Sequence, residues 1–231
     1  EATLITSANY PFAGTVQGGV TQTSLPNPDL RWELSRQTNI GLDASFLNGK
    51  IQFTADYFIK KTENMILAAP IPGSTGVSEA PLVNAGDVLN RGIELSLGYQ
   101  KAEGVFHYSV NANGTFIKNK VTSLGIGVPI EGRFPDADGA VVTVTEKGYA
   151  IGSFIGYVTD GIFQTQEEID KHATQPGATP GDIRFKDLNN DGVINGKDET
   201  ILGNPIPEFS YGLSLNADYK GFDISIFGQG I

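Results

Sequence analysis

The chain contains no cysteine among its 231 residues. Disulfide bridges and thiolate metal sites are therefore excluded, so a long loop in this protein must be held in shape by other means. Only two histidines are present, His107 and His172, which are too few for a three-histidine zinc site. No apolar run approaches the ~20 residues that a membrane-spanning helix requires.

Basic residues are also scarce. The chain has 16 lysines and arginines against 26 aspartates and glutamates, which gives a formal net charge of −10 at pH 7. This balance argues against a nucleic-acid partner, because phosphate backbones are bound by cationic surfaces. No signal peptide is found and the chain starts at Glu1 without a methionine, so we expect a mature form or a fragment of a longer protein.

Motifs of catalysis are missing as well. There is no Ser-His-Asp arrangement, no G-x-S-x-G motif and no glycine loop of the kind that cradles phosphates. We therefore expect that the chain is not an enzyme and has no catalytic residues.

Glycine and aromatic residues are abundant instead. The chain has 29 glycines and 10% aromatic residues, a composition that favours an all-β fold. Six segments alternate between apolar and polar residues with a period of two, so each has one apolar and one polar face. These segments are 39–46, 51–60, 93–100, 106–116, 209–219 and 222–229.

The connections between these segments alternate in length. Short turns are expected at 47–50, which contains the hairpin signal Asn48-Gly49, at 100–104 and at 220–221. Long connections run from 61 to about 90 and from about 119 to 207. A membrane-spanning barrel has this asymmetry, with short turns on one side and long loops on the other.

Two folds are compatible with the alternation. In a soluble β-sandwich the apolar faces pack together, whereas in an outer-membrane barrel they meet lipid. Aromatic residues beside the short turns favour the barrel, because they form an interfacial girdle at one membrane edge. Five of the six apolar-face positions next to these turns are aromatic: Phe46, Ile51, Tyr99, Phe106, Tyr219 and Phe222.

The alternation also predicts which side chains meet lipid. We expect the lipid-facing set to include Leu42, Phe53, Leu95, Val110, Leu213 and Ile224. The set facing the lumen should include Asp43, Asp56, Glu94, Asn111, Asn216 and Asp223.

A barrel must close, because an unpaired strand edge in lipid leaves backbone groups unsatisfied. Six strands with loops of this length are too few for a complete barrel, and the sequence stops inside an apparent strand, FDISIFGQGI. We therefore expect a fragment of a large antiparallel transmembrane β-barrel. Its spanning strands are expected at about 30–60, 91–118 and 209–231, and its extracellular loops at about 61–90 and 119–207.

The stretch DLNNDGVINGKD, residues 187–198, has the spacing of a calcium-binding loop. The expected ligands of one structural calcium ion are Asp187, Asn189, Asp191, the Val193 carbonyl and Asp198. Gly192 occupies the position of the sharp turn. The stretch departs from the usual motif because it ends in aspartate rather than glutamate and lacks flanking helices. A polar turn without metal is the alternative, since clusters of Asn, Asp and Gly form turns by themselves.

The second long connection is the most acidic part of the chain. Residues 121–208 contain 14 acidic and 6 basic residues and so carry −8 of the net charge of −10. We expect these charges to solvate an exposed loop. We expect its aromatic residues to pack the loop rather than stack on sugar rings, and we expect 154–163 to form a packed hairpin. The aromatic residues are Phe134, Phe154, Tyr157, Phe163 and Phe185.

Four stretches of the chain carry a family pattern. They are LRWELSRQTNIGLDASFLNGKIQFTADYFIKKTENMIL (30–67), NAGDVLNRGIELSLGY (84–99), IGSFIGYVTDGIFQTQEEID (151–170) and PGDIRFKDLNNDGVINGKDETILGNPIPEFSYGLSLNADYKGFDISIFGQG (180–230). Together they resemble the C-terminal barrel portion of SusC-like TonB-dependent outer-membrane transporters of Bacteroidetes. They stand in family order and cover more than half of the chain.

The resemblance implies a function that the residues alone do not show. SusC-like proteins form a large barrel with an N-terminal plug domain and import oligosaccharides, or sometimes peptides, across the outer membrane. They take energy from the TonB complex and work with a SusD-like surface lipoprotein. The plug and the TonB box are absent from this chain, so any energy-coupling residues lie outside it.

Two other functions fit the same residues. One is a secreted, calcium-stabilised β-sandwich that binds carbohydrate, and the other is a purely structural, adhesin-like barrel. The substrate-binding residues cannot be assigned from the sequence under any of these hypotheses.

Overall fold

The computed structural model describes residues 4–23, 25–69, 71, 73–75, 79–133 and 139–231. The chain divides into two compact units. Unit 1 comprises Glu1–Val128 and Glu208–Ile231, and unit 2 comprises Pro129–Pro207.

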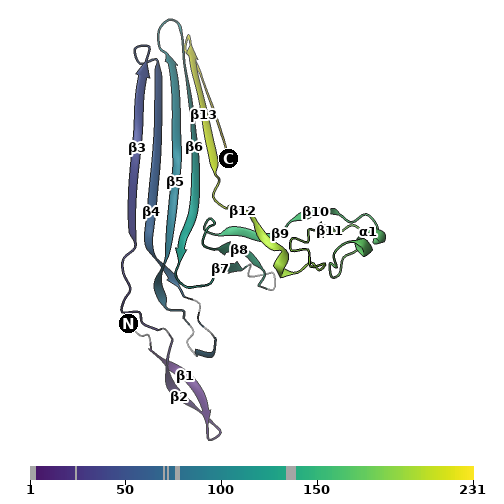
Figure 1. Cartoon of the computed structure of the whole chain (residues 1–231). Helices are drawn as coiled ribbons and strands as arrows, with labels where there is room; N and C mark the ends of the chain where they lie inside the picture. The colour runs from purple at the N-terminus through teal and green to yellow at the C-terminus, as the bar shows by residue number, and fades with distance from the viewer. Residues whose placement is uncertain (1–3, 24, 70, 72, 76–78, 134–138) are drawn as a thin grey trace. The chain divides into compact units, whose positions relative to one another are not determined.

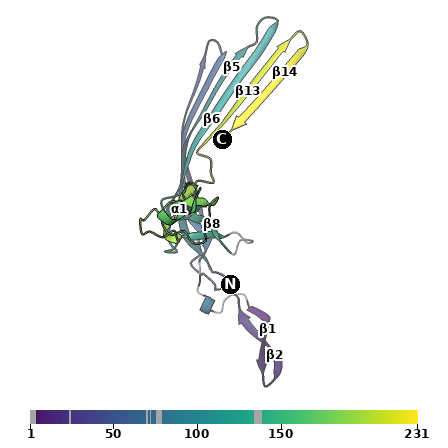
Figure 2. The ribbon, with the colours of Figure 1, turned by 90° about the vertical axis from the view of Figure 1, so that its right-hand side faces the viewer.

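A six-stranded antiparallel sheet forms most of unit 1 (Figures 1 and 2). The strand order across the sheet is β14-β13-β6-β5-β4-β3. Each of the six alternating segments forms one of these strands, as the sequence predicts. The strands are β3 (Leu34–Phe46), β4 (Ile51–Ala68), β5 (Leu82–Lys101), β6 (Phe106–Leu124), β13 (Phe209–Tyr219) and β14 (Phe222–Gly230).

The short turns adopt the backbone geometry that hairpins favour. Lys220 and Gly221 join β13 to β14 with φ angles of 49° and 87°. Leu47, Asn48 and Gly49, between β3 and β4, have φ angles of 52°, 54° and 84°. In the β13–β14 turn, two successive residues with positive φ match the right-handed twist of the flanking strands, which explains the glycine at its second position.

The register of the sheet separates an apolar face from a polar face. Leu42 pairs with Ala55, which pairs in turn with Leu95, so these three side chains share one face. On the opposite face Asp56 pairs with Glu94. The structure therefore confirms the expected alternation across neighbouring strands.

The apolar face of the sheet is not covered by a core. In the described part of unit 1 the buried apolar residues are Ala85, Val88 and Val121, which lie toward the end of the sheet away from the short turns. Leu42, in contrast, keeps 59% of its surface exposed. A β-sandwich would bury this face against a second sheet. The arrangement therefore favours a sheet whose apolar face meets lipid.

Three of the strands are longer than the sequence alternation indicates. β4, β5 and β6 have 18, 20 and 19 residues, whereas a tilted strand spans a membrane with about 9–11. Pairing continues to Ala68 with Leu82 and to Leu124 with Gly86, across several bulges. The ends of the two long connections are thus paired, bulged strand, and the loops proper are shorter than expected.

Unit 2 contains a four-stranded antiparallel sheet and a two-stranded sheet. The larger sheet has the order β12-β9-β8-β7 and the smaller one joins β10 to β11. A short helix and a single 3-10 turn complete the unit. The elements are β7 (Ile130–Arg133), β8 (Val141–Thr145), β9 (Ser153–Tyr157), β10 (Thr159–Ile162), α1 (Gln166–Lys171), β11 (Ile183–Phe185), η2 (Gly196–Asp198) and β12 (Glu199–Gly203).

Residues 154–163 do not form the hairpin that the sequence predicts. β9 pairs with β8 and with β12, whereas β10 pairs with β11. The two adjacent strands belong to different sheets, because each pairs with a strand that follows later in the chain, β9 with β12 and β10 with β11.

Unit 1 also contains the hairpin β1 (Leu4–Phe12) and β2 (Thr15–Gln22) and the 3-10 turn η1 (Gly73–Thr75). Among the described residues, no helix has the length and apolar character needed to cross a membrane.

Candidate functional site

Aromatic rings contact one another at the short-turn end of the apolar face. Tyr99 and Tyr108 have ring centroids 5.7 Å apart, and those of Phe106 and Tyr108 are 5.6 Å apart. The rings of Phe106 and Tyr219 also meet edge-on, with centroids 6.3 Å apart. Three of the five aromatic residues expected beside the turns, Tyr99, Phe106 and Tyr219, thus form a continuous group with Tyr108 across β5, β6 and β13.

A second aromatic group lies farther along the same face. Phe116 stacks on Phe209 with centroids 4.5 Å apart, and Phe209 lies 5.6 Å from Tyr211. Leu97, Ala112 and Leu213 lie between the two groups, because the alternation continues from one to the other. An apolar band bounded by aromatic residues at both edges is typical of an outer-membrane barrel wall.

The sequence reasoning missed this second group. Its signal is the same alternation, followed eight to ten residues along the strands from Phe106 and Tyr219 beside the turns.

The polar face is connected by side-chain hydrogen bonds. The Thr54 hydroxyl donates to Asp43 at 2.8 Å, and the Ser225 hydroxyl donates to Asn216 at 2.8 Å. His107 Nδ1 lies 2.8 Å from an Asp218 oxygen. Polar side chains on this face therefore bind one another across strands, as residues in a hydrated lumen can.

The ends of the predicted calcium loop come together in unit 2. Asp198 is fully buried, with 0% of its surface exposed, and receives backbone N–H groups from Asn195 and Leu188. The Asn195 N–H is the main reason why the pKa of Asp198 is lowered from its ordinary value, while burial acts in the opposite direction. The Asp187 side chain lies beside Asp198.

One oxygen of Asp187 has no partner. Asp187 Oδ2 accepts the backbone N–H of Gly192 at 2.8 Å, whereas Asp187 Oδ1 is buried without a hydrogen bond. A buried carboxylate oxygen without a donor is costly, and a cation beside it would remove that cost. The pair of Asp187 and Asp198, the first and last expected ligands, therefore fits a hard cation.

The middle of the loop is organised by local hydrogen bonds. Asn189 Oδ1 accepts the backbone N–H of Asp191 at 2.8 Å, and Asp191 Oδ1 accepts that of Val193 at 3.0 Å. The Val193 carbonyl accepts from the Asn195 side chain at 3.0 Å. Such bonds also occur in a polar turn without metal.

Asp191 does not join the two terminal carboxylates. Its second oxygen accepts from the Asn189 amide at 3.0 Å and lies 4.0 Å from Lys197 Nζ. Across the described ranges, no three acidic or histidine side chains converge on one point. The structure thus brings together Asp187 and Asp198 but not the full expected set, and the calcium site stays a prediction.

Aromatic residues of unit 2 mostly pack within the unit. Phe163 is 0% exposed and meets His172 edge-on at 5.3 Å, and Tyr157 lies 5.1 Å from Phe185. Burial is the main cause that raises the pKa of Tyr157. Phe154 is exposed, and Phe134 lies outside the described residues. Of the described four, Phe154 is the one whose ring is available for a ligand.

Comparison with known proteins supports the same architecture. The family model "TonB dependent receptor-like, beta-barrel" matches residues 4–229. TonB-dependent receptor P3 of Formosa agariphila is 32% identical over 231 residues, covering 96% of this chain and 23% of the relative. TonB-dependent receptor SusC of Bacteroides thetaiotaomicron is 29% identical over 228 residues, covering 94% of this chain and 21% of the relative. The chain thus spans less than a quarter of each of these relatives.

A solved structure shares the fold. The structure of the RagAB peptide transporter superposes with a TM-score of 0.75 at 23% identity, covering 99% of this chain and 23% of that one. The match extends over both units, and it agrees with the alternation, the aromatic groups and the uncovered apolar face. The expectation that the chain is not an enzyme agrees with membership of a receptor family. The chain belongs to the TonB-dependent receptor-like β-barrel family and is a fragment of an outer-membrane barrel.

Proposed function

We propose that this chain forms part of the barrel wall and the surface loops of a TonB-dependent importer of oligosaccharides or similar nutrients. The observation that carries the proposal is the six-stranded sheet with one uncovered apolar face bounded by aromatic residues. Its apolar face meets the lipid of the outer membrane and its polar face lines the lumen. The long connections 61–90 and 119–207 lie outside the cell.

The partners of the whole transporter follow from its relatives. Similarity to SusC favours a SusD-like surface lipoprotein as the partner that captures substrate. Energy reaches the barrel from the TonB complex through a plug domain. The polar luminal face suits a hydroxyl-rich oligosaccharide, but amide groups of a peptide can use the same donors and acceptors.

An uptake assay tests this function. A strain that lacks the full-length transporter is compared with the complemented strain, each supplied with labelled oligosaccharides and with labelled peptides of similar mass. We expect the deletion, or loss of TonB, to abolish oligosaccharide uptake and to leave peptide uptake unchanged. Loss of peptide uptake alone contradicts the substrate class, and uptake of both in all strains contradicts the importer.

We also propose that unit 2 is stabilised by one calcium ion held by Asp187, Asn189, Asp191, the Val193 carbonyl and Asp198. The proposal is supported by the pairing of Asp187 with Asp198 and by the unpartnered Asp187 Oδ1. The ion would be structural, because it supplies a cross-link to a surface segment without cysteine. It has no part in catalysis.

Limited proteolysis of the full-length transporter tests the calcium proposal. Chelation and Asp187→Ala should each speed cleavage within 180–204, because the ligand carboxylates repel one another without the ion. Asp170→Ala serves as the control, since this exposed carboxylate lies on α1 outside the loop. Unchanged cleavage after both treatments would show that the loop is a polar turn without metal.

A further inference from the structure

Two cationic side chains lie on the apolar face of the sheet. Arg91 of β5 pairs with Lys118 of β6, and both lie two positions along their strands from the apolar pair Ile93 and Phe116. Alternation therefore places the two cations on the same face as the lipid-facing residues. They lie beyond the second aromatic group, toward the end of the sheet opposite the short turns.

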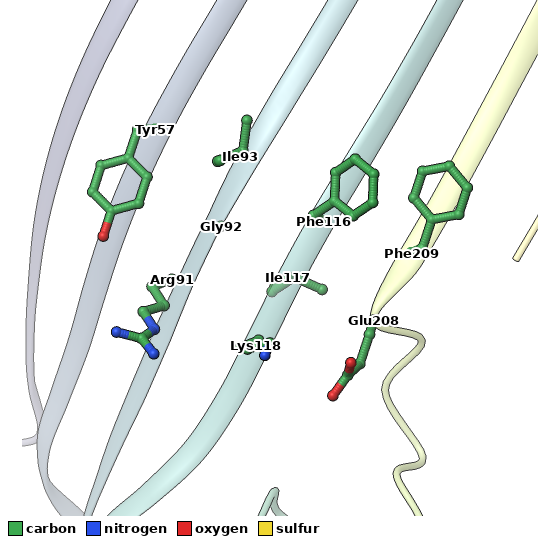
Figure 3. Close-up of a pocket in the computed structure, with 9 residues that line it drawn as sticks. All are labelled: Tyr57, Arg91, Gly92, Ile93, Phe116, Ile117, Lys118, Glu208 and Phe209. Atoms are coloured by element: carbon green, nitrogen blue, oxygen red, sulfur yellow. The ribbon is translucent and has the colours of Figure 1, made fainter.

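A groove of about 510 Å³ surrounds the two cations (Figure 3). Its apolar walls are Tyr57, Ile93, Phe116 and Phe209. Figure 3 shows the Tyr57 hydroxyl pointing toward the end of the groove where Arg91 lies. The groove is thus apolar at one end and cationic at the other, with a phenol between them.

The groove has one carboxylate, that of Glu208, for its two cations. In the ranges that the structure describes, neither Arg91 nor Lys118 forms an ion pair, although Glu208 also lines the groove. Charged side chains on the lipid face are costly at mid-membrane but tolerated near the interface. Two free cations beside an aromatic group therefore mark the headgroup level of the membrane, where an anion can approach them.

We propose that this groove binds the phosphate-bearing headgroup of an outer-membrane lipid. Arg91 and Lys118 receive the phosphate, the Tyr57 hydroxyl donates to a headgroup oxygen, and the acyl chain lies along Ile93 and Phe116. A lipid fits better than a soluble anion because the groove opens on the lipid-facing side of the sheet. It fits better than a second protein copy because the cations match a phosphate.

The lipid proposal rests on the proposed function, which places this sheet in the outer membrane. Which leaflet supplies the lipid follows from the proposal that the long connections lie outside the cell. Lipid on the side of the long connections is the outer leaflet. Lipid binding is measured without substrate, so failure of the uptake proposal leaves this test intact.

Native mass spectrometry of the full-length transporter in detergent tests the site. Diphosphorylated lipid A, the same lipid without phosphates, and inorganic phosphate are each titrated. We expect tight binding of the phosphorylated lipid only, and a loss of about 30-fold in the double variant Arg91→Gln/Lys118→Gln, since each cation near an anionic headgroup adds about fivefold. Arg91→Lys should retain most of the binding.

Lys60→Gln is the matched control. Lys60 pairs with Asn90 at the same level of the sheet but on the polar face, so its loss should leave lipid binding unchanged. Equal binding of the lipid without phosphates, or undiminished binding by the double variant, overturns the proposal. Competition by inorganic phosphate shows a soluble-anion site instead. A lower oligomeric state of the double variant than of the unmodified transporter shows an interface between copies instead.

Discussion

At the scale of the residue, neighbouring side chains of β5 meet different surroundings. Leu95 lies on the apolar face between Ala55 and Gly114, whereas Glu94 lies on the polar face beside Asp56. A charge at mid-membrane on the lipid face costs ~2–4 kcal/mol, but a charge in a hydrated lumen costs far less. One step along the strand therefore changes the expected effect of the same substitution.

We expect Leu95→Arg to reduce the amount of assembled full-length transporter strongly, and Glu94→Arg to reduce it little. The measurement is the fraction of folded barrel in outer-membrane preparations, read from heat-modifiable gel mobility. Equal assembly of the two variants would contradict the assignment of the faces.

Gly92 is a second position where one added side-chain atom should change the stability of the protein. A Cβ added there would meet the backbone oxygen of Phe116 and lie 2.7 Å from the ring of Phe58. The backbone cannot yield easily, so Gly92→Ala should lower the free energy of unfolding by about 1–3 kcal/mol.

Gly98→Ala is the matched control for this prediction. There the added Cβ would lie 2.8 Å from Asn111 Oδ1, the end of a side chain that can rotate away. Thermal unfolding of the two variants in detergent should give the lower midpoint for Gly92→Ala. The reverse order would contradict the packing described for Gly92.

At the scale of the element, alternation predicted the six strands because each spanning portion has one apolar and one polar face. The outer parts of β4 and β5 escaped prediction, because KKTENMIL and VNAGD lack a clean period of two, although the two segments pair with each other across bulges. The prediction of a hairpin at 154–163 was wrong because β9 pairs with β12, which lies more than forty residues further along the chain. Local pattern contains no information about such long-range pairing.

The candidate site shows the same limit. The spacing of residues 187–198 identified Asp187 and Asp198, which the fold does bring together. The spacing could not reveal that the side chain of Asp191 turns toward Asn189 and Lys197. Nor did it single out Arg91 and Lys118, which become a pair only through the register of β5 with β6.

The lengths of the connections between strands predict which end of the barrel faces the periplasm and which faces the outside of the cell. We expect Asn48, in the short turn, to face the periplasm, and Lys147, in the turn after β8, to face the outside. This chain has no cysteine, so single variants Asn48→Cys and Lys147→Cys can be labelled in the full-length transporter after any cysteine elsewhere is replaced.

A membrane-impermeant maleimide should label Lys147→Cys on intact cells and Asn48→Cys only after the outer membrane is opened. The opened sample controls for reactivity, because both side chains are exposed. Labelling of Asn48→Cys on intact cells would invert the proposed topology.

At the scale of the whole molecule, the sheet has two edges, β3 and β14, that pair on one side only within the described structure. Lipid cannot satisfy the free backbone groups of such edges. We therefore expect further strands of the full-length protein to pair with β3 and β14 and to close the barrel, in line with relatives more than four times as long as the matched region.

The central claim is that one face of this sheet meets lipid and the other meets water. Spin labels placed one at a time from Ile93 to Tyr99 in the full-length transporter, reconstituted in bilayers, test it most directly. Oxygen, which dissolves in lipid, should broaden the signals of labels at 93, 95, 97 and 99. A water-soluble nickel reagent should instead broaden the signals of labels at 94, 96 and 98. Uniform accessibility along the strand, or alternation in the opposite phase, would contradict the account.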